Sequence, residues 1–453
     1  MRATASSTPS PAKIELAPLA THHSRFTTME RLISFFGLFV MIGLAWLMSS
    51  HKRQVNPRII IGGLFLQITF ALVILLTVPG RFVFETLGSF FQQLLSFSDS
   101  GAAFLFDIHP DEGDAPLPPT YTLWRSFAFR ILPTIVFFSS LMSVLYYMGI
   151  MQRIVEFFAW IMRKTLKTSG AETLSAAANI FVGQTEAPLV IRPFVASMTL
   201  SELNVVMVGG FATIAGGVFA AFVQFGANPG HLITASVISA PAALMIAKIM
   251  LPETEHSQTM GHVELALEEK SSNVIEAAAE GATAGMKLAL NVAAMLIAFV
   301  ALIHLANGVV GWFGGLFGWN WSLEQAFGYA FWPFAWLMGI PTTECFTAGQ
   351  LLGTKMVVNE FLAYFQLGQI MESDKALVEA GQEAQRQLSD RSATILTYAL
   401  CGFANFSSIG IQLGGIGGIA PERRGDLARL GLRAMIGGTL AAFMTACIAG
   451  ILI

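Results

Sequence analysis

The sequence predicts an all-α polytopic membrane protein with about eight transmembrane helices, two re-entrant helical hairpins in an inverted repeat, and interfacial helices. Three observations predict this fold class. Hydrophobic residues make up 54% of the 453-residue chain and charged residues only 12%, about half the charged fraction of soluble domains. Apolar runs long enough to cross a bilayer recur along the chain, and two further stretches have apolar arms too short to do so.

Composition also excludes several classes of function. The formal net charge is −3, and no basic patch is dense enough to suggest a nucleic-acid partner. Cys345, Cys401 and Cys447 lie within or beside apolar runs, without the spacing of a disulfide framework or a metal site. We interpret these cysteines as small packing residues.

Apolar runs of roughly 20 residues predict the crossings. They cover residues 32–49, 59–79, 127–149, 204–227, 229–251, 287–309 and 434–453, with a more polar candidate at 392–417. Residues 1–29 are rich in Ser, Thr, Ala and Pro and are predicted to be disordered. Because this tail lacks the pattern of a signal peptide, we expect the first apolar run to be a retained helix.

Loop charge predicts the orientation. Lys and Arg gather after the first span, after the third and before the last, so we assign these three loops to the cytoplasm, whereas the acidic segment 99–114 falls outside. Both termini are then non-cytoplasmic in the cell (inner) membrane, although basic residues in the N-terminal tail argue the other way. Residues 81–97, 151–165 and 252–284 are predicted as interfacial or solvated helices.

Residues 172–195 and 333–365 each contain two short arms around a polar, Gly- or Pro-bearing centre. We interpret each as a re-entrant helical hairpin whose tip faces an internal aqueous site, since irregular backbone in a membrane needs such surroundings. A helix containing GFAT (210–213) follows the first and one containing GFAN (402–405) follows the second. The predicted orientation brings the hairpins in from opposite sides, and this inverted repeat of interrupted helices is typical of secondary transporters.

Ionisable residues in membrane segments cost roughly 2.5–3.5 kcal/mol on insertion scales, so they indicate function. Glu186 and Glu360 lie at the two hairpin centres. Uncharged polar residues accompany them in the same segments: Gln184, Thr185, Asn359, Asn405 and Ser408. Carboxylates, amides and hydroxyls suit a neutral solute with many hydroxyl and N–H groups. An aromatic face for a planar group is available from Phe211, Phe403 and Phe406.

Structural roles compete with these assignments. Glu186 would cap a hairpin arm, and Glu360 would pair with Lys355 or Arg130. Asn405 and Ser408 would bond between helices, and Thr213 would bond back to its own helix.

A cation site requires convergent oxygens. Asn179 precedes Gln184 by five residues, and an unwound stretch about Val182 would expose backbone carbonyls. Thr213 and Ile214 lie in the interrupted helix that follows. One amide oxygen, one hydroxyl and a few carbonyls make a weak, neutral site that suits Na⁺ better than Mg²⁺.

Five motifs carry a resemblance. They are GQTEAP at 183–188, GGFATIAGG at 209–217, SNVIEAA at 272–278, NEFLAY at 359–364 and CGFANFSSIG at 401–410. With these motifs in this order, the chain resembles the concentrative nucleoside transporter family from about Ile33 to the C-terminus. The resemblance implies a homotrimer in which each protomer holds a scaffold domain and a moving transport domain.

The resemblance also implies residue roles. Gln184, Thr185 and Glu360 would contact the nucleobase, Glu186, Asn405 and Ser408 the ribose, and Phe403 would pack against the nucleoside. Asn179, Val182, Thr213 and Ile214 match the positions that hold sodium in sodium-coupled members. The expected domains are a tail at 1–29, scaffold helices at 30–165, first hairpin and interrupted helix at 166–228, connecting elements at 229–320, second hairpin and interrupted helix at 321–418, and a last scaffold span at 419–453.

The expected function is sodium-coupled import of nucleosides by an elevator-like, alternating-access symporter, with Na⁺ as coupling ion and the lipid bilayer as surroundings. Proton coupling through Glu186 or Glu360 is the alternative. A membrane enzyme using the two carboxylates as an acid–base pair would lack a nucleophile–base pair and a His/Cys metal cluster, so we expect the protein not to be an enzyme. A channel would show flux without saturation. The sequence does not indicate purine or pyrimidine preference.

Overall fold

The computed structural model describes residues 26–106, 127–259, 271–316, 318 and 322–453. Within these residues the regular elements are helices and no strand occurs, so the all-α prediction is confirmed. The predicted N-terminal tail lies largely outside the described residues. Helix α1 (Phe26–Leu47) begins inside the segment that was expected to be tail.

The first part of the chain folds into long helices. They are α1, α2 (Pro57–Leu76), α3 (Val78–Phe106), α5 (Leu132–Tyr147) and α6 (Ile150–Leu166), with a 3₁₀ turn η1 (Lys52–Gln54) and a π-helical turn η2 (Phe127–Ile131) before α5. Helix α3 is longer than the interfacial helix predicted at 81–97, because its polar residues are helical as well. Helices α5 and α6 meet at a bend of 77°. Gly149 lies at this bend with φ +75°, a conformation that glycine adopts without a Cβ clash.

The predicted first hairpin and the helix after it form several short pieces. They are α7 (Gly170–Ala178), η3 (Ala187–Ile191), α8 (Arg192–Val195), α9 (Leu200–Ala212) and α10 (Gly216–Gln224), followed by α11 (Pro229–Met250). Residues 179–186 between α7 and η3 form what we call the first tip. Residues 213–215 between α9 and α10 form the first break, where the sequence predicted an interrupted helix.

A buried charge network anchors this region. Ser169 and Thr199 begin α7 and α9 with capping boxes, in which Glu172 and Glu202 accept from the backbone N–H of the capping residue. The ammonium of Lys248 on α11 lies 2.8 Å from the Glu172 carboxylate, and both side chains are almost fully buried. Lys248 also donates to the Ser201 hydroxyl of α9 at 2.9 Å, so the starts of α7 and α9 are both fixed to the end of α11.

The C-terminal part begins with a very long helix. Its elements are α12 (Val274–Gly315), α13 (Leu323–Leu337), α14 (Cys345–Val357), α15 (Glu360–Glu379), η4 (Glu383–Gln385), α16 (Asp390–Leu400), α17 (Phe406–Ile419), η5 (Pro421–Arg423) and α18 (Arg424–Leu452). We call residues 358–359, between α14 and α15, the second tip. Residues 401–405, between α16 and α17, form the second break.

Two predicted boundaries in this part are wrong. A separate helix was expected at 252–284, but Glu276 and Glu280 belong to the first turns of the 42-residue α12. The second hairpin was expected at 333–365, but residues 333–337 belong to α13, and α15 continues to Glu379. In α12 and at the end of α15, polar residues belong to a helix that the apolar pattern alone would have made shorter.

Six helical segments of the described chain are long and apolar enough to cross a membrane, or seven if the bent α5–α6 pair counts as one. The predicted crossing at 392–417 is not among them; the second break divides it into α16 and α17. The predicted crossing at 204–227 is one of the six, as the segment Leu200–Gln224, even though the first break divides it. The count of about eight crossings remains a prediction.

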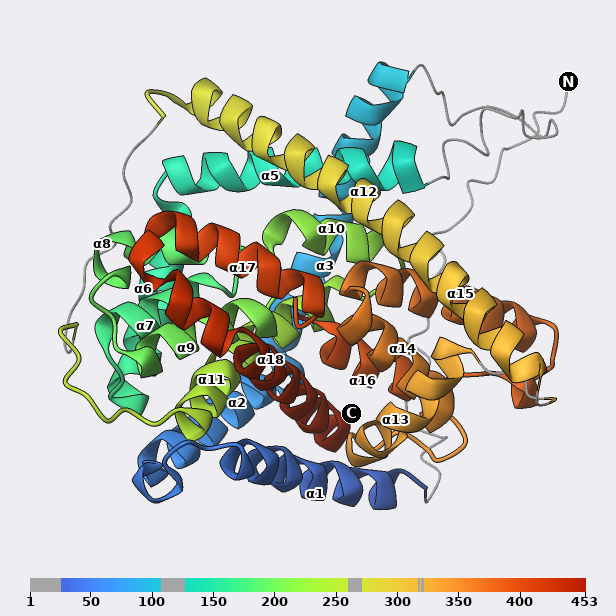
Figure 1. Cartoon of the computed structure of the whole chain (residues 1–453). Helices are drawn as coiled ribbons and strands as arrows, with labels where there is room; N and C mark the ends of the chain where they lie inside the picture. The colour runs from blue at the N-terminus through green and yellow to red at the C-terminus, as the bar shows by residue number, and fades with distance from the viewer. Residues whose placement is uncertain (1–25, 107–126, 260–270, 317, 319–321) are drawn as a thin grey trace, which may run out of the picture.

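Helix α18 runs through the centre of the molecule and packs against α1, α9, α11, α16 and α17 (Figure 1). Helices α5 and α12 lie side by side at one edge (Figure 1). Only 11% of the apolar window of α12 is buried, against 83% for the segment containing α18. An apolar helix this exposed needs lipid or another protein as cover.

Candidate functional site

The two helix breaks touch each other. The backbone N–H of Phe403 in the second break donates to the carbonyl of Thr213 in the first, at 3.3 Å. Gly402 has φ +143°, and a Cβ there would lie 2.7 Å from the Phe211 carbonyl oxygen. A glycine at this position therefore lets the breaks approach closely.

A buried polar cluster links the second tip to α17. Glu360 is the first residue of α15, and its carboxylate accepts from the Asn405 amide at 2.8 Å. Asn405 caps α17, since its side-chain oxygen accepts from the backbone N–H of Ser408 at 2.9 Å. Both carboxylate and cap are favourable at helix N-termini. The motif residues of two distant segments thus form one hydrogen-bonded unit.

The first tip joins this unit through an amide. The side-chain N–H of Gln184 donates to the Ser408 hydroxyl at 3.1 Å, and its carbonyl oxygen accepts from the Gln412 amide, also at 3.1 Å. The methyl of Thr185 faces Gly415 of the same helix, where a Cβ would lie 2.9 Å from it. Both tips therefore converge on α17.

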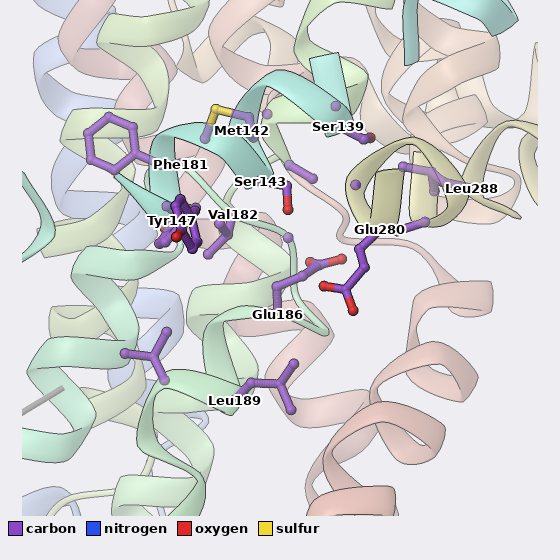
Figure 2. Close-up of a pocket in the computed structure, with 18 of the residues that line it drawn as sticks. Ser139, Met142, Ser143, Tyr147, Phe181, Val182, Glu186, Leu189, Glu280 and Leu288 are labelled. Carbon is purple, nitrogen blue, oxygen red and sulfur yellow. The ribbon is translucent and has the colours of Figure 1, made fainter. Parts of the chain in front are cut away.

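Glu186 faces a cavity of about 560 Å³ between the first tip and helices α5, α6 and α12 (Figure 2). Figure 2 shows the side chains of Glu186 and Glu280 extending toward one another from the tip and from α12. Val182 of the first tip lines the same cavity. Glu360 is not among its lining residues, so the cavity receives one predicted carboxylate rather than both.

Two of the predicted cation ligands, Asn179 and Val182, belong to the first tip, and Val182 lines this cavity. Asn179 is fully buried, and its side-chain oxygen has no hydrogen-bond partner among the described residues, whereas its N–H donates to the Ser175 carbonyl. Its amide also lies about 3.1 Å from where a Cβ on Gly209 would stand, which places it against α9 just ahead of the first break. A buried, unpaired amide oxygen next to unwound backbone fits a cation of Na⁺ type.

The competing structural roles can be compared with these contacts. Glu186 makes no side-chain cap of η3. Lys355 donates to the Ala399 carbonyl at 2.8 Å, and no ion pair between it and Glu360 is found in the described part of the chain. Thr213 does bond back to its own helix, through the Gly209 carbonyl at 2.9 Å, so its hydroxyl has only lone pairs left for a cation.

Three aromatic residues were expected near a planar group. Phe211 is fully buried, Phe403 is 9% exposed and Phe406 is 50% exposed. Of these three residues only Phe403 lies in a helix break, directly after Gly402.

Two residues of this region were missed in the sequence. Gln412 lies on α17, four residues after Ser408 and hence on the same helix face, which is the signal that could have found it. Glu280 was assigned to a solvated helix because its acidic neighbours suggested one. Its place in α12, opposite Glu186, depends on tertiary packing that spacing does not reveal.

Three family models match the chain. "Na+ dependent nucleoside transporter N-terminus" matches residues 36–108, "Nucleoside recognition" residues 128–229, and "Na+ dependent nucleoside transporter C-terminus" residues 231–450. An "Uncharacterized transporter" of Haemophilus influenzae is 45% identical over 94% of this chain and 98% of its own length. The chain belongs to the concentrative, Na⁺-dependent nucleoside transporter family. It is thus a member of a family of transporters rather than enzymes, with Na⁺ as the family's coupling ion.

Vertebrate relatives are longer than this concentrative transporter chain. "Solute carrier family 28 member 3" of Eptatretus stoutii is 44% identical over 93% of this chain and 61% of its own length. "Sodium/nucleoside cotransporter 1" of Rattus norvegicus is 43% identical over 93% of this chain and 64% of its own. The chain therefore spans about three-fifths of these relatives.

Solved structures give the same family. CNTnw in an inward-facing substrate-bound state is 41% identical, with a TM-score of 0.84 over 94% of this chain and 97% of its own. A CNTnw variant in an outward-facing state is 40% identical, with a TM-score of 0.83 over 93% and 98%. The all-α prediction and the resemblance to concentrative nucleoside transporters are both confirmed.

Proposed function

We propose that this protein is a sodium-coupled symporter that imports nucleosides across the cell membrane. The observation that carries the proposal is the contact between the two breaks, from the Phe403 N–H to the Thr213 carbonyl. This bond joins the first break, which contains Thr213 and Ile214 of the proposed cation set, to the second break, which contains Phe403 and Asn405 of the proposed nucleoside set. Occupancy of one set can therefore influence the other.

The residues divide by chemistry. Asn179, Val182, Thr213 and Ile214 would hold Na⁺ through neutral oxygens. In the described part of the chain no cluster of three His, Cys, Asp or Glu residues could hold a metal ion instead. The nucleoside set comprises Gln184, Thr185, Glu186, Glu360, Phe403, Asn405 and Ser408, which supply amides, hydroxyls and carboxylates for the hydroxyls of a ribose and the edge of a base. Phe403 would supply a stacking face.

Alternating access would come from an elevator-like movement of the tips and interrupted helices against a scaffold. Relatives in inward- and outward-facing states support this mechanism. The exposed apolar length of α12 would meet lipid or neighbouring protomers, which agrees with a homotrimer in the inner membrane. Both termini would be non-cytoplasmic.

Uptake of [³H]uridine into proteoliposomes tests the proposal. We expect saturable uptake that requires Na⁺ outside and stops when choline replaces it. Glu186→Gln and Glu360→Gln should each reduce it, and uridine recovered inside should be chemically unchanged. Uptake driven by a pH gradient without Na⁺ would instead establish the proton-coupled alternative, and no saturable nucleoside uptake under either gradient would overturn the proposal.

A further inference from the structure

Gln184 of the first tip is hydrogen-bonded to a second buried glutamine, Gln412 of α17. Gln412 is fully buried, and its amide nitrogen donates to the Gln184 carbonyl oxygen and to the backbone carbonyl of Met207, both at 3.1 Å. A Cβ on Gly210 would lie 2.8 Å from the Gln412 nitrogen and 2.8 Å from the Gln184 Cβ, so the two amides meet where a glycine leaves space. None of the sequence motifs includes Gln412.

The polarity of this contact is fixed at one end. A backbone carbonyl can only accept, so the Met207 oxygen requires the N–H side of the Gln412 amide. The second N–H of that amide then points to Gln184, which must turn its own carbonyl oxygen toward it. The Gln184 amide nitrogen is left facing the Ser408 hydroxyl, which can accept. One backbone carbonyl thereby determines which way Gln184 faces.

The orientation of Gln184 matters for a base. After these two contacts the amide retains one N–H and one carbonyl lone pair. Uracil presents an N3 donor beside an O4 acceptor, whereas cytosine presents an N3 acceptor beside an N4 donor. If the ribose fixes the position of the base, one orientation of the Gln184 amide matches the donor and acceptor of uracil. The opposite orientation matches those of cytosine.

We propose that Gln412 is a positioning residue, which fixes the carboxamide of Gln184 in one orientation and thereby sets the discrimination between uracil-type and cytosine-type base edges. This rests on the proposed function. The loss of a well-formed bidentate pair with a base is worth about 1–3 kcal/mol, which is a change of about 5- to 150-fold in discrimination.

Three variants change the contact between Gln412 and Gln184 in different ways. In Gln412→Glu the new carboxyl has at most one proton to donate, and the Met207 carbonyl requires it, so the oxygen facing Gln184 must accept and the Gln184 amide must turn over. Gln412→Met removes the donor and lets Gln184 take both orientations. Gly210→Ala pushes the two amides apart.

The assay is uptake of uridine and of cytidine at saturating Na⁺, compared as the ratio of their Vmax/KM values. We expect this ratio to move about tenfold or more in Gln412→Glu, in favour of the base that the wild type disfavours, and toward one in Gln412→Met and Gly210→Ala. Because a merely structural role would lower both substrates together, the ratio is the informative quantity. Half-maximal Na⁺ concentration should stay near the wild-type value.

Gln67→Met is the matched control. Like Gln412, Gln67 on α2 is fully buried and donates to a backbone carbonyl, and its side-chain oxygen has no partner among the described residues. No hydrogen bond between Gln67 and Gln184 is found in the described part of the chain. Its ratio should equal that of the wild type. Where a variant loses uptake, the same ratio is read from protection of the purified protein by uridine and cytidine against thermal unfolding. An unchanged ratio in every folded variant, or a wild-type ratio near one, overturns the inference. Absence of nucleoside uptake by the wild type overturns the proposed function instead.

Discussion

Gly402→Ala should weaken the binding of Na⁺ and of nucleoside together. Gly402 has φ +143°, which an alanine rarely adopts. The added Cβ would lie 2.7 Å from the Phe211 carbonyl and 2.9 Å from the Ala212 carbonyl carbon, closer than real Cβ atoms approach. Because these are backbone atoms, the breaks themselves must separate, and the hydrogen bond from the Phe403 N–H to the Thr213 carbonyl lengthens.

The size of the effect follows from the strain. A non-glycine residue in such backbone conformations costs on the order of 1–3 kcal/mol. If the bound state requires the breaks in contact, this cost subtracts from the binding free energy of both ligands. A loss of that size corresponds to about a 5- to 150-fold rise in the Na⁺ concentration for half-maximal uptake and in the KM for uridine.

The assay is uridine uptake into proteoliposomes over a range of Na⁺ concentrations at fixed membrane potential. Gly410→Ala is the matched control, since Gly410 lies on α17 and a Cβ there meets nothing within 4 Å. Its Na⁺ and uridine dependence should stay within about twofold of the wild type. Wild-type Na⁺ dependence in a folded Gly402→Ala protein would refute the view that the breaks transmit occupancy.

Three further outcomes are expected. Lys248→Met should lower the stability by about 3–5 kcal/mol, because it leaves the buried Glu172 carboxylate without its cation. The control Lys375→Met, at an exposed position, should leave the melting temperature unchanged. Equal melting temperatures of the two variants would contradict the prediction. Lys355→Met should cost about 1–3 kcal/mol, because the Ala399 carbonyl loses its donor in an apolar interior. Because Lys355 lies on α14, which leads into the second tip and Glu360, this variant should reduce thermal protection by uridine more than thermal protection by Na⁺. A larger loss of protection by Na⁺ would contradict this prediction. Asn179→Ala should raise the half-maximal Na⁺ concentration about tenfold or more. It should cost less in stability without Na⁺, because the Asn179 oxygen has no partner among the described residues and only the bond from its N–H to the Ser175 carbonyl is lost. A Na⁺ titration checks the first part and a melting curve without Na⁺ the second.

Much of the fold could be predicted because membrane helices follow hydropathy. The GFAT and GFAN motifs located both breaks, since a glycine and a polar residue at membrane depth are tolerated where protein covers them. Boundaries were less predictable. The start of α12 at Val274 is amphipathic, and its helical continuity through Glu280 depends on packing against α5 rather than on an apolar run.

The candidate site was predictable as a set of residues but not as a set of contacts. Hairpin centres and breaks identified Gln184, Glu360 and Asn405, whereas pairing is a property of three-dimensional placement. Gln412 was missed because one amide in a Gly- and Ile-rich helix resembles an isolated packing residue. Spacing also did not separate Glu186, which faces the cavity, from Glu360, which is buried against Asn405.

The arrangement of the breaks gives a physical route for coupling. Unwound backbone in a low-dielectric interior leaves carbonyls and N–H groups that must find partners. Here the Phe403 N–H is satisfied by the Thr213 carbonyl, while the Asn179 oxygen has no partner in the part of the chain that the structure describes. A cation that engaged this oxygen and the first break would hold Thr213 in place. It would thereby hold the Phe403 amide and the start of α17, where Asn405 and Ser408 present their side chains. Since coupling is reciprocal, a nucleoside that ordered the start of α17 must tighten cation binding by the same factor. Measuring the Na⁺ affinity with and without saturating uridine, and the uridine affinity with and without saturating Na⁺, should therefore give equal ratios, and in Gly402→Ala both ratios should fall toward one.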